Sequence, residues 1–303
     1  MVTTRGAGAA YASTTPMMLM YALGILLVAG LALTAVFNGA RYQPWMPESG
    51  DGTTLTVGRA ALVYLRGAAI GLVGGFWAGA LVTGPAMRLI MRLLAVTGGD
   101  EAQGMRTEAN EIVGDIDLGG TSDLYVFGGL LPGLASGFLY VLLRRWLPAG
   151  RLGGVAFGAL HLVLLATRLD PLRPENVDFD LVGPGWLAVL TFGLASIVHG
   201  MAVVALANRY SRTLPLTGKS RVARVRQLAP LILPVLFMVP AAFLLVPLGL
   251  GLGFGVLVLR VDGRERITAH RAFLLGPRLA ILLVGLAFLP ATVVDLRAVL
   301  FRS

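Results

Sequence analysis

The chain contains no cysteine, and only one of its 25 basic residues is a lysine. Without cysteine, disulfide bonds, thiolate metal sites, iron–sulfur clusters and cysteine nucleophiles are excluded. Charge is also scarce, since 14% of the 303 residues are charged, against about a quarter in soluble proteins. The sequence has no Gly-x-Ser-x-Gly elbow, no phosphate-binding loop ending in lysine and no paired-histidine metal motif. It therefore gives no indication of an enzyme.

Long apolar runs dominate the sequence, which is 56% hydrophobic with a mean hydropathy of +0.78. A transmembrane helix needs about 20 apolar residues, and six runs qualify or come close: Pro16–Phe37, Ala60–Val82, Leu124–Leu143, Leu152–Thr167, Trp186–Ala207 and Leu279–Val294. The uncharged stretch Leu228–Leu259 contains four prolines and is too long for one span, at about 1.5 Å per residue, so it predicts two short helices. We therefore predict an all-α, polytopic transmembrane bundle, a single domain over 1–303 with about eight spans; seven is the alternative.

The distribution of arginine predicts the orientation in the membrane. With eight spans, 16 basic residues lie on one side and 8 on the other, and the richer side is expected to be cytoplasmic. Both termini are then outside, and 208–227 is a basic inner loop for which anionic membrane lipid is a sufficient partner. No nucleic-acid partner is implied. The excess of arginine over lysine suggests a GC-rich bacterial genome, hence a bacterial cytoplasmic (inner) membrane protein.

The longest polar interlude, 83–123, is predicted to lie on the outer side. It opens with Gly84-Pro85, which we expect to break the preceding helix. The segment 86–96 that follows has Arg88 and Arg92 one turn apart on one face, and it predicts a short helix lying in the membrane interface.

Acidic residues concentrate in the same interlude. A helix over Thr107–Asp115 would put its carboxylates on one face, where they would pair with the two arginines. The predicted outer polar cluster consists of Arg88, Arg92, Glu108, Glu111 and Asp115. A cation site at Asp115, Asp117 and Asp123 is an alternative, although the bidentate glutamate of a calcium loop is missing.

Glycine recurs every four residues on two predicted helices. The positions are Gly67, Gly71, Gly75 and Gly79 on the second span and Gly129, Gly133 and Gly137 on the third. Small residues at this spacing let two backbones approach closely in a membrane. We expect these helices to pack together, with a homo-oligomer interface as the alternative use of the same faces.

Two histidines, His161 and His199, lie in predicted spans at depths that agree within roughly 2 Å. Hydrogen bonding between helices is the expected role, with Ser196 as a neighbour of His199. The alternatives are two axial ligands for a b-type haem and a contact with a substrate or proton. No other cofactor is expected.

Three functions remain open. The first is a non-catalytic membrane subunit or scaffold that packs with itself or a membrane protein partner and docks through its acidic outer surface. The second is a small-solute permease, which the lack of an intramembrane carboxylate disfavours. The third is a b-type haem electron-transfer subunit.

Overall fold

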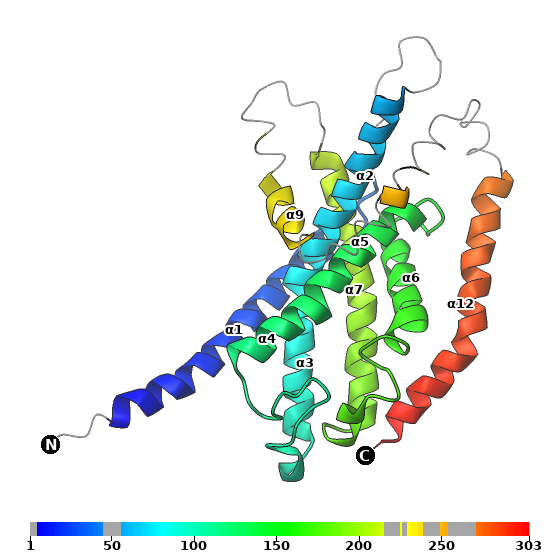
Figure 1. Ribbon diagram of the computed structural model, residues 1–303. Coiled ribbons are helices and arrows are strands. Elements are labelled where there is room, and N and C mark those ends of the chain that lie inside the picture. The colour runs from blue at the N-terminus through cyan, green and yellow to red at the C-terminus, as the bar shows by residue number, and fades with distance from the viewer. Residues whose placement is uncertain are drawn as a thin grey trace.

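A computed structural model of the chain describes residues 5–44, 56–214, 225, 229–238, 249–251, 253 and 271–302 (Figure 1). Helices and loops make up these residues, which contain no β-strand and one isolated bridge between Arg106 and Ile112. The helices are α1 (Arg5–Phe37), α2 (Val57–Ala78), α3 (Gly84–Thr97), α4 (Leu118–Tyr125), α5 (Leu131–Leu143), α6 (Arg151–His161), α7 (Gly185–Thr213), α9 (Ile232–Met238) and α12 (Arg271–Leu300). Short 3₁₀ turns cover Asp100–Ala102, Val177–Asp180 and Ala229–Leu231.

Among these residues, five helical segments are long and apolar enough to cross a membrane. They are Pro16–Phe37, Val57–Thr97, Leu118–Leu143, Gly185–Thr213 and Leu275–Leu300, and Arg151–Ala166 is a shorter apolar helix. The all-helical membrane class is therefore supported, and the count of eight spans stays a prediction. The two spans expected in Leu228–Leu259 lie mostly outside the described residues, as does most of the basic loop 208–227, although α7 runs on to Thr213.

The predicted break at Gly84-Pro85 is wrong. A π-helical turn, Gly79–Thr83, joins α2 to α3, and the helix continues without a bend in backbone conformation at Thr83 or Gly84. The Gly84 amide donates to the carbonyl of Gly79, five residues back. An ordinary α-helix would place the proline ring against the carbonyl four residues before it, and the wider turn absorbs that conflict. Residues 86–96 are therefore the end of a long helix and not a separate interfacial helix.

A second π-helical turn, Val126–Leu130, joins α4 to α5 and also precedes a proline, Pro132. The two π-helical turns lie against each other: a Cβ added at Gly79 would overlap the carbonyl oxygen of Gly129. Deeper in the bundle, a Cβ added at Gly75 would likewise overlap the carbonyl oxygen of Gly133. A Cβ added at Gly71 would lie 2.5 Å from the carbonyl oxygen of Gly137. The backbones of α2 and α5 thus touch along the glycine repeat.

A second pair of helices, α6 and α7, also meets through glycine, which the sequence analysis missed. A Cβ at Gly158 would lie 2.6 Å from Ile197 Cα, and one at Gly200 would overlap the backbone of Gly158. The helix α2 also contacts α7 at Gly74, where a Cβ would lie 2.6 Å from the Ala207 nitrogen. The centre of the bundle is therefore the group α2, α5, α6 and α7.

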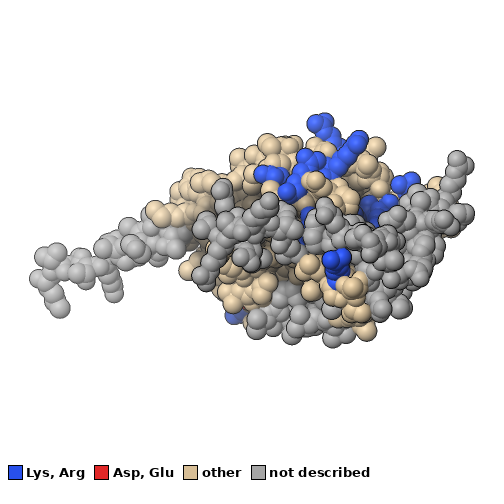
Figure 2. Space-filling view, turned by 90° about the horizontal axis from the view of Figure 1, so that it is seen from above, with Lys and Arg blue, Asp and Glu red and all other residues tan. Residues whose placement is uncertain are grey.

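Charge separates between the two ends of this bundle. The upper end in Figure 1 carries the C-terminal ends of α5 and α7 and the starts of α2 and α6. Its described residues hold no Asp or Glu, and Figure 2, which looks onto this end, shows blue groups and no red ones. Its arginines are Arg41, Arg59, Arg144, Arg145, Arg151, Arg209 and Arg212. We call this the basic end.

The opposite end is formed by three loops that hydrogen-bond to one another. The Glu108 amide donates to Asp178 Oδ1 (2.7 Å), and the Gly185 amide donates to the carbonyl of Arg302 (3.1 Å). All 12 acidic residues of the described chain lie in these loops or beside them. We call this the acidic end.

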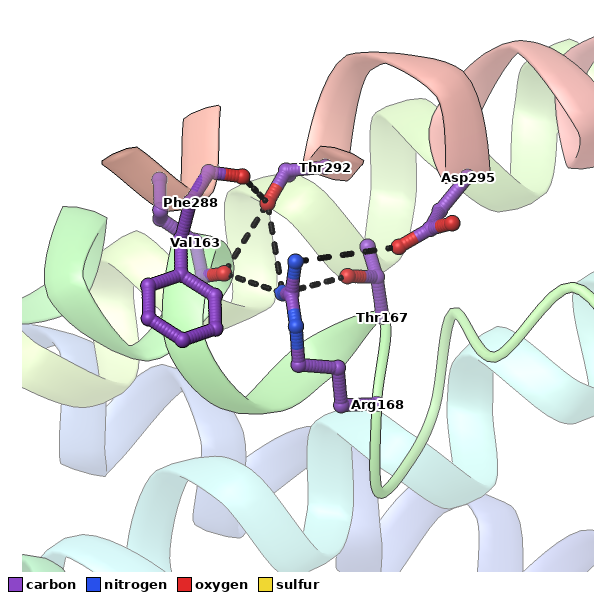
Figure 3. A network of polar contacts seen from close by, with 6 residues as sticks. All are labelled: Val163, Thr167, Arg168, Phe288, Thr292 and Asp295. Carbon is purple, nitrogen blue, oxygen red and sulfur yellow. Dashed lines mark hydrogen bonds and ion pairs between the residues drawn. The ribbon is translucent and has the colours of Figure 1, made fainter. Parts of the chain in front are cut away.

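The C-terminal helix α12 is held to the bundle by a polar cluster around Arg168 (Figure 3). Thr292 Oγ1 on α12 donates to the carbonyl of Val163 (2.9 Å), which also accepts from Arg168 Nη1. Arg168 Nη2 lies 4.0 Å from Asp295 Oδ2, and its guanidinium stands 4.8 Å from the ring centre of Phe288. Val163 belongs to a third π-helical turn, Leu162–Ala166, that follows α6. This turn leaves the Val163 carbonyl available for the two side chains.

Candidate functional site

Four buried side chains form an unbroken hydrogen-bonded chain in the middle of the bundle. Thr83 Oγ1 lies 2.6 Å from His199 Nδ1, and His199 Nε2 lies 2.9 Å from Ser136 Oγ. Ser136 Oγ is also 2.7 Å from His161 Nε2, and His161 Nδ1 is 2.9 Å from the carbonyl oxygen of Phe157. Each of the four side chains is buried. We call this set the polar chain.

Three of the four residues of the polar chain lie in or close to π-helical turns. Thr83 is the last residue of the π-helical turn after α2, and His161 is the last residue of α6 before its own π-helical turn. Ser136 sits beside Gly137, within the glycine face of α5. A π-helical turn therefore contains Thr83, another precedes the helix of Ser136, and a third follows His161. Such turns are frequent at functional sites.

The carbonyl at the end of the polar chain fixes the position of every hydrogen in it. A carbonyl only accepts, so His161 Nδ1 carries a hydrogen, and in the neutral ring His161 Nε2 is then an acceptor. Ser136 must give its one hydroxyl hydrogen to that nitrogen, so His199 Nε2 donates to Ser136. His199 Nδ1 then accepts from the Thr83 hydroxyl. Neutral rings are expected, since a buried imidazolium with no anionic hydrogen-bond partner is costly.

The structure places His161 and His199 side by side, with ring centres 5.3 Å apart and planes at 75°. Their Nε2 atoms share the single hydroxyl of Ser136, where a haem would need its iron and porphyrin between the two rings. The arrangement does not fit the haem hypothesis. The expected neighbour Ser196 instead donates to the carbonyl of Phe192 (3.0 Å).

A cavity of about 780 Å³ lies between the polar chain and the acidic end. Such a volume is within the range of small-molecule sites. Its walls are mostly apolar, and they include Met87, Met91, Leu124, Phe127, Leu139 and Phe192. Phe127 and Leu139 are also exposed on the outer surface of the bundle, so the rim of the cavity extends along an apolar side of the bundle as well as the acidic end.

Arg88 and Arg92 line the mouth of the cavity and hold the polar interlude through its backbone. Arg88 Nη2 donates to the carbonyl of Asp115 (3.2 Å) and its Nε to Thr121 Oγ1 (3.1 Å), while Arg92 Nη1 donates to the carbonyl of Gly114 (2.9 Å). These contacts differ from the predicted carboxylate pairs. Among the ion pairs of the described residues, Glu108 instead pairs with Arg173 at 2.6 Å.

The predicted helix over Thr107–Asp115 is also wrong. Asn110 has φ 63° and Gly114 has φ 92°, and the left-handed region does not occur inside a right-handed helix. The segment is a tight hairpin, in which the Thr107 amide donates to the carbonyl of Glu111 (2.8 Å). Asn and Gly are the residues that favour this conformation, so the sequence did contain a signal for turns.

The carboxylates proposed for a cation site have other roles. Asp117 is the N-cap of α4 and accepts from the Gly120 amide (2.8 Å), and Asp115 Oδ1 accepts from the Ile116 amide (2.8 Å). Within the described ranges, no three His, Asp or Glu side chains are grouped so that they could hold a metal ion. Asp123 lines the cavity together with Glu111 and Asp115.

Two further carboxylates at the mouth of the cavity, Asp170 and Asp178, have raised pKa values. In both, desolvation by the surrounding loops raises the pKa, and for Asp178 the hydrogen bond from the Glu108 amide opposes that shift. A raised pKa means that the ionised form is less well solvated than in water. A cation placed near these carboxylates would therefore be stabilised.

Toward the basic end the bundle is closed by a second polar layer that the sequence analysis did not identify. Tyr140 donates to Asn208 Oδ1 (2.6 Å), and Asn208 Nδ2 donates to the carbonyl of Ala40 (2.8 Å). Below this layer is the close contact between Gly71 and Gly137. The cavity is thus closed toward the basic end, and it opens at the acidic end and along the apolar side of the bundle.

Arg66 lies on the basic side of this layer and is buried. Its Nε donates to the carbonyl of Leu214 (2.8 Å) and its Nη2 to the carbonyl of Ser211 (2.6 Å). The last carbonyls of a helix have no partner within it. Arg66 therefore caps α7 from a neighbouring helix.

The described residues form an all-helical bundle that contains a cavity, and five of its helical segments are long and apolar enough to cross a membrane. This architecture is consistent with a multi-pass membrane protein. No protein-family model matches the chain, and no curated protein and no solved structure is detectably similar to it.

Proposed function

We propose that this protein binds a small amphipathic solute in the cavity between α3, α4, α5, α6 and α7. The observation that carries the proposal is the cavity itself, which joins apolar walls to a buried polar floor. Ligand sites in proteins combine these features, with few polar groups that fix orientation. A scaffold that only docks through its acidic surface does not account for such a cavity.

The orientation follows from the charges at the two ends. Counted over the whole sequence, the segments expected on the side of the basic end hold 16 basic residues, against 8 on the other side. This Lys and Arg bias favours a cytoplasmic basic end. The cavity then faces the outer side of a bacterial inner membrane, and both termini lie on that same side. The solute would enter from outside or from the membrane plane.

A permease is the second candidate function, and the position of the polar chain favours it. The cavity ends in the middle of the bundle, where transporters hold their substrates, and the glycine contacts and the Tyr140–Asn208 layer close the other side. The structure would then represent one of two access states. Both candidates require the same binding site.

A cysteine introduced into this cysteine-free chain tests the binding site. Ala195 lines the cavity, so we expect the Ala195→Cys variant of the purified protein to react with N-ethylmaleimide. Added 1-hexanol should slow that reaction several-fold, because a neutral molecule with a short apolar body fits the walls. Ala202→Cys, in the core outside the cavity, should remain unreactive.

Ser122→Cys is the matched control, because Ser122 is exposed at the acidic end but does not line the cavity. Its reaction rate should not change with 1-hexanol. Slowing of both variants to the same degree would contradict the proposed function.

A further inference from the structure

All the hydrogens of the polar chain are already used. Thr83 and Ser136 give their hydroxyl hydrogens to the two imidazoles, and each neutral imidazole gives its one N–H to Ser136 or to the Phe157 carbonyl. At the cavity surface, only lone pairs remain available to a ligand. Thr83 Oγ1 has two of them and Ser136 Oγ has one. The floor can therefore accept hydrogen bonds and has no donor left to offer.

A third hydroxyl group in the cavity wall can also accept a hydrogen bond from a ligand but has no hydrogen left to donate. Ser196 lines the cavity and donates its hydrogen to the carbonyl of Phe192, one turn back on α7. Its lone pairs also remain available. A ligand with a carboxylate or phosphate would find no donor at the floor, while a ligand rich in N–H groups would find up to three acceptors.

The mouth of the cavity favours the same kind of ligand through its charge. Its lining contains five carboxylates, Glu111, Asp115, Asp123, Asp170 and Asp178, against two guanidiniums. Both guanidiniums donate to carbonyls of the polar interlude, which commits them to holding that loop. A cation approaching this mouth meets an excess of negative charge, and charge of one sign around a cleft raises the local concentration of the opposite ion.

We propose that the cavity selects an organic amine, in which a protonated amino group donates to Thr83 and Ser136 and a small apolar body lies against the walls. This inference rests on the proposed function, because it names the chemical class of the solute. The histidines act as positioning residues: they orient the two hydroxyl groups so that their lone pairs face the ligand.

The test compares n-hexylamine with n-hexanoate as protectants of the Ala195→Cys variant against N-ethylmaleimide. At pH 7 the amine is a cation and the carboxylate an anion, and their apolar bodies are alike. Because the floor offers acceptors and no donor, half-protection by hexylamine should need about a tenfold lower concentration than by hexanoate, a difference of about 1.4 kcal/mol.

Thr83→Val in the Ala195→Cys background removes one acceptor with little change in shape. We expect it to reduce the preference for hexylamine over hexanoate to about threefold or less. Thr191→Val is the matched control, since Thr191 lies on α7 outside the cavity and its hydroxyl bonds to the Leu187 carbonyl. Asp178→Asn, which keeps the oxygen that accepts from Glu108, should also weaken the preference.

The outcomes separate the two proposals. Protection by 1-hexanol without a preference for the amine would reject the amine inference and leave the proposed function standing. Protection by none of the three compounds would reject the proposed function. A preference for hexanoate would show that Arg88 and Arg92 bind the ligand, and it would overturn the inference.

Discussion

Replacing Gly75 with leucine is expected to separate α2 from α5 and to lower the free energy of unfolding by about 3 kcal/mol or more. Even a Cβ at Gly75 would overlap the carbonyl oxygen of Gly133, and a backbone cannot move aside as a flexible side chain can. The measurement is the melting temperature of the purified protein in detergent, followed by the fraction that stays monodisperse after heating.

Gly193→Leu is the matched control for this change. Gly193 also lies within a long apolar helix, and a Cβ there meets nothing within 4 Å. Leucine is a better helix former than glycine by roughly 1 kcal/mol, so this variant should be as stable as the unaltered protein. Equal stability of the Gly75 and Gly193 variants would mean that the glycine face of α2 does not carry a close helix contact.

Replacing Arg66 with methionine should cost about 2–3 kcal/mol of stability, because it leaves the carbonyls of Ser211 and Leu214 without their donor in a buried position. Arg59→Met is the control, as Arg59 is exposed on the same helix. Hydrogen exchange of the last turn of α7 should rise in the Arg66 variant and not in the control. Unchanged exchange at α7 would show that Arg66 does not cap this helix.

The sequence predicted most accurately the features that are encoded within a single helix. The apolar runs located α1, α7 and α12, because length and hydropathy alone decide whether a helix can cross a membrane. The glycine repeats marked two faces that lie against each other in the structure. The rise per residue predicted similar depths for the two histidines, and in the structure both contact Ser136.

The wrong predictions concern two segments in which the backbone conformation differs from the one that the local sequence pattern normally indicates. Gly84-Pro85 normally ends a helix, and the sequence gives no sign that a π-helical turn will absorb the proline. The acidic spacing suggested a helix over 107–115, but Asn110 and Gly114 take left-handed conformations there. In both cases the surrounding contacts, and not the local pattern, determined the chain path.

The polar chain itself could not be predicted in full, because its members come from four separate segments. Ser136 reads as a small residue within a glycine face, and Thr83 as the first residue of a loop. Only the packing of α2 against α5, and of α6 against α7, brings them to the histidines. Pairing of side chains across helices depends on helix rotation, which the spacing along one sequence does not fix.

The sidedness of the cavity is the most direct test of this account. In sealed vesicles of known orientation, a membrane-impermeant, charged thiol reagent should label Ala195→Cys from the same side as Ser122→Cys at the acidic end. Labelling of Ala149→Cys, in the exposed loop between α5 and α6 at the basic end, should occur only from the opposite side. Labelling of Ala195→Cys from the side of Ala149, or from neither side while both end markers react, would contradict a bundle cavity that opens toward the acidic end.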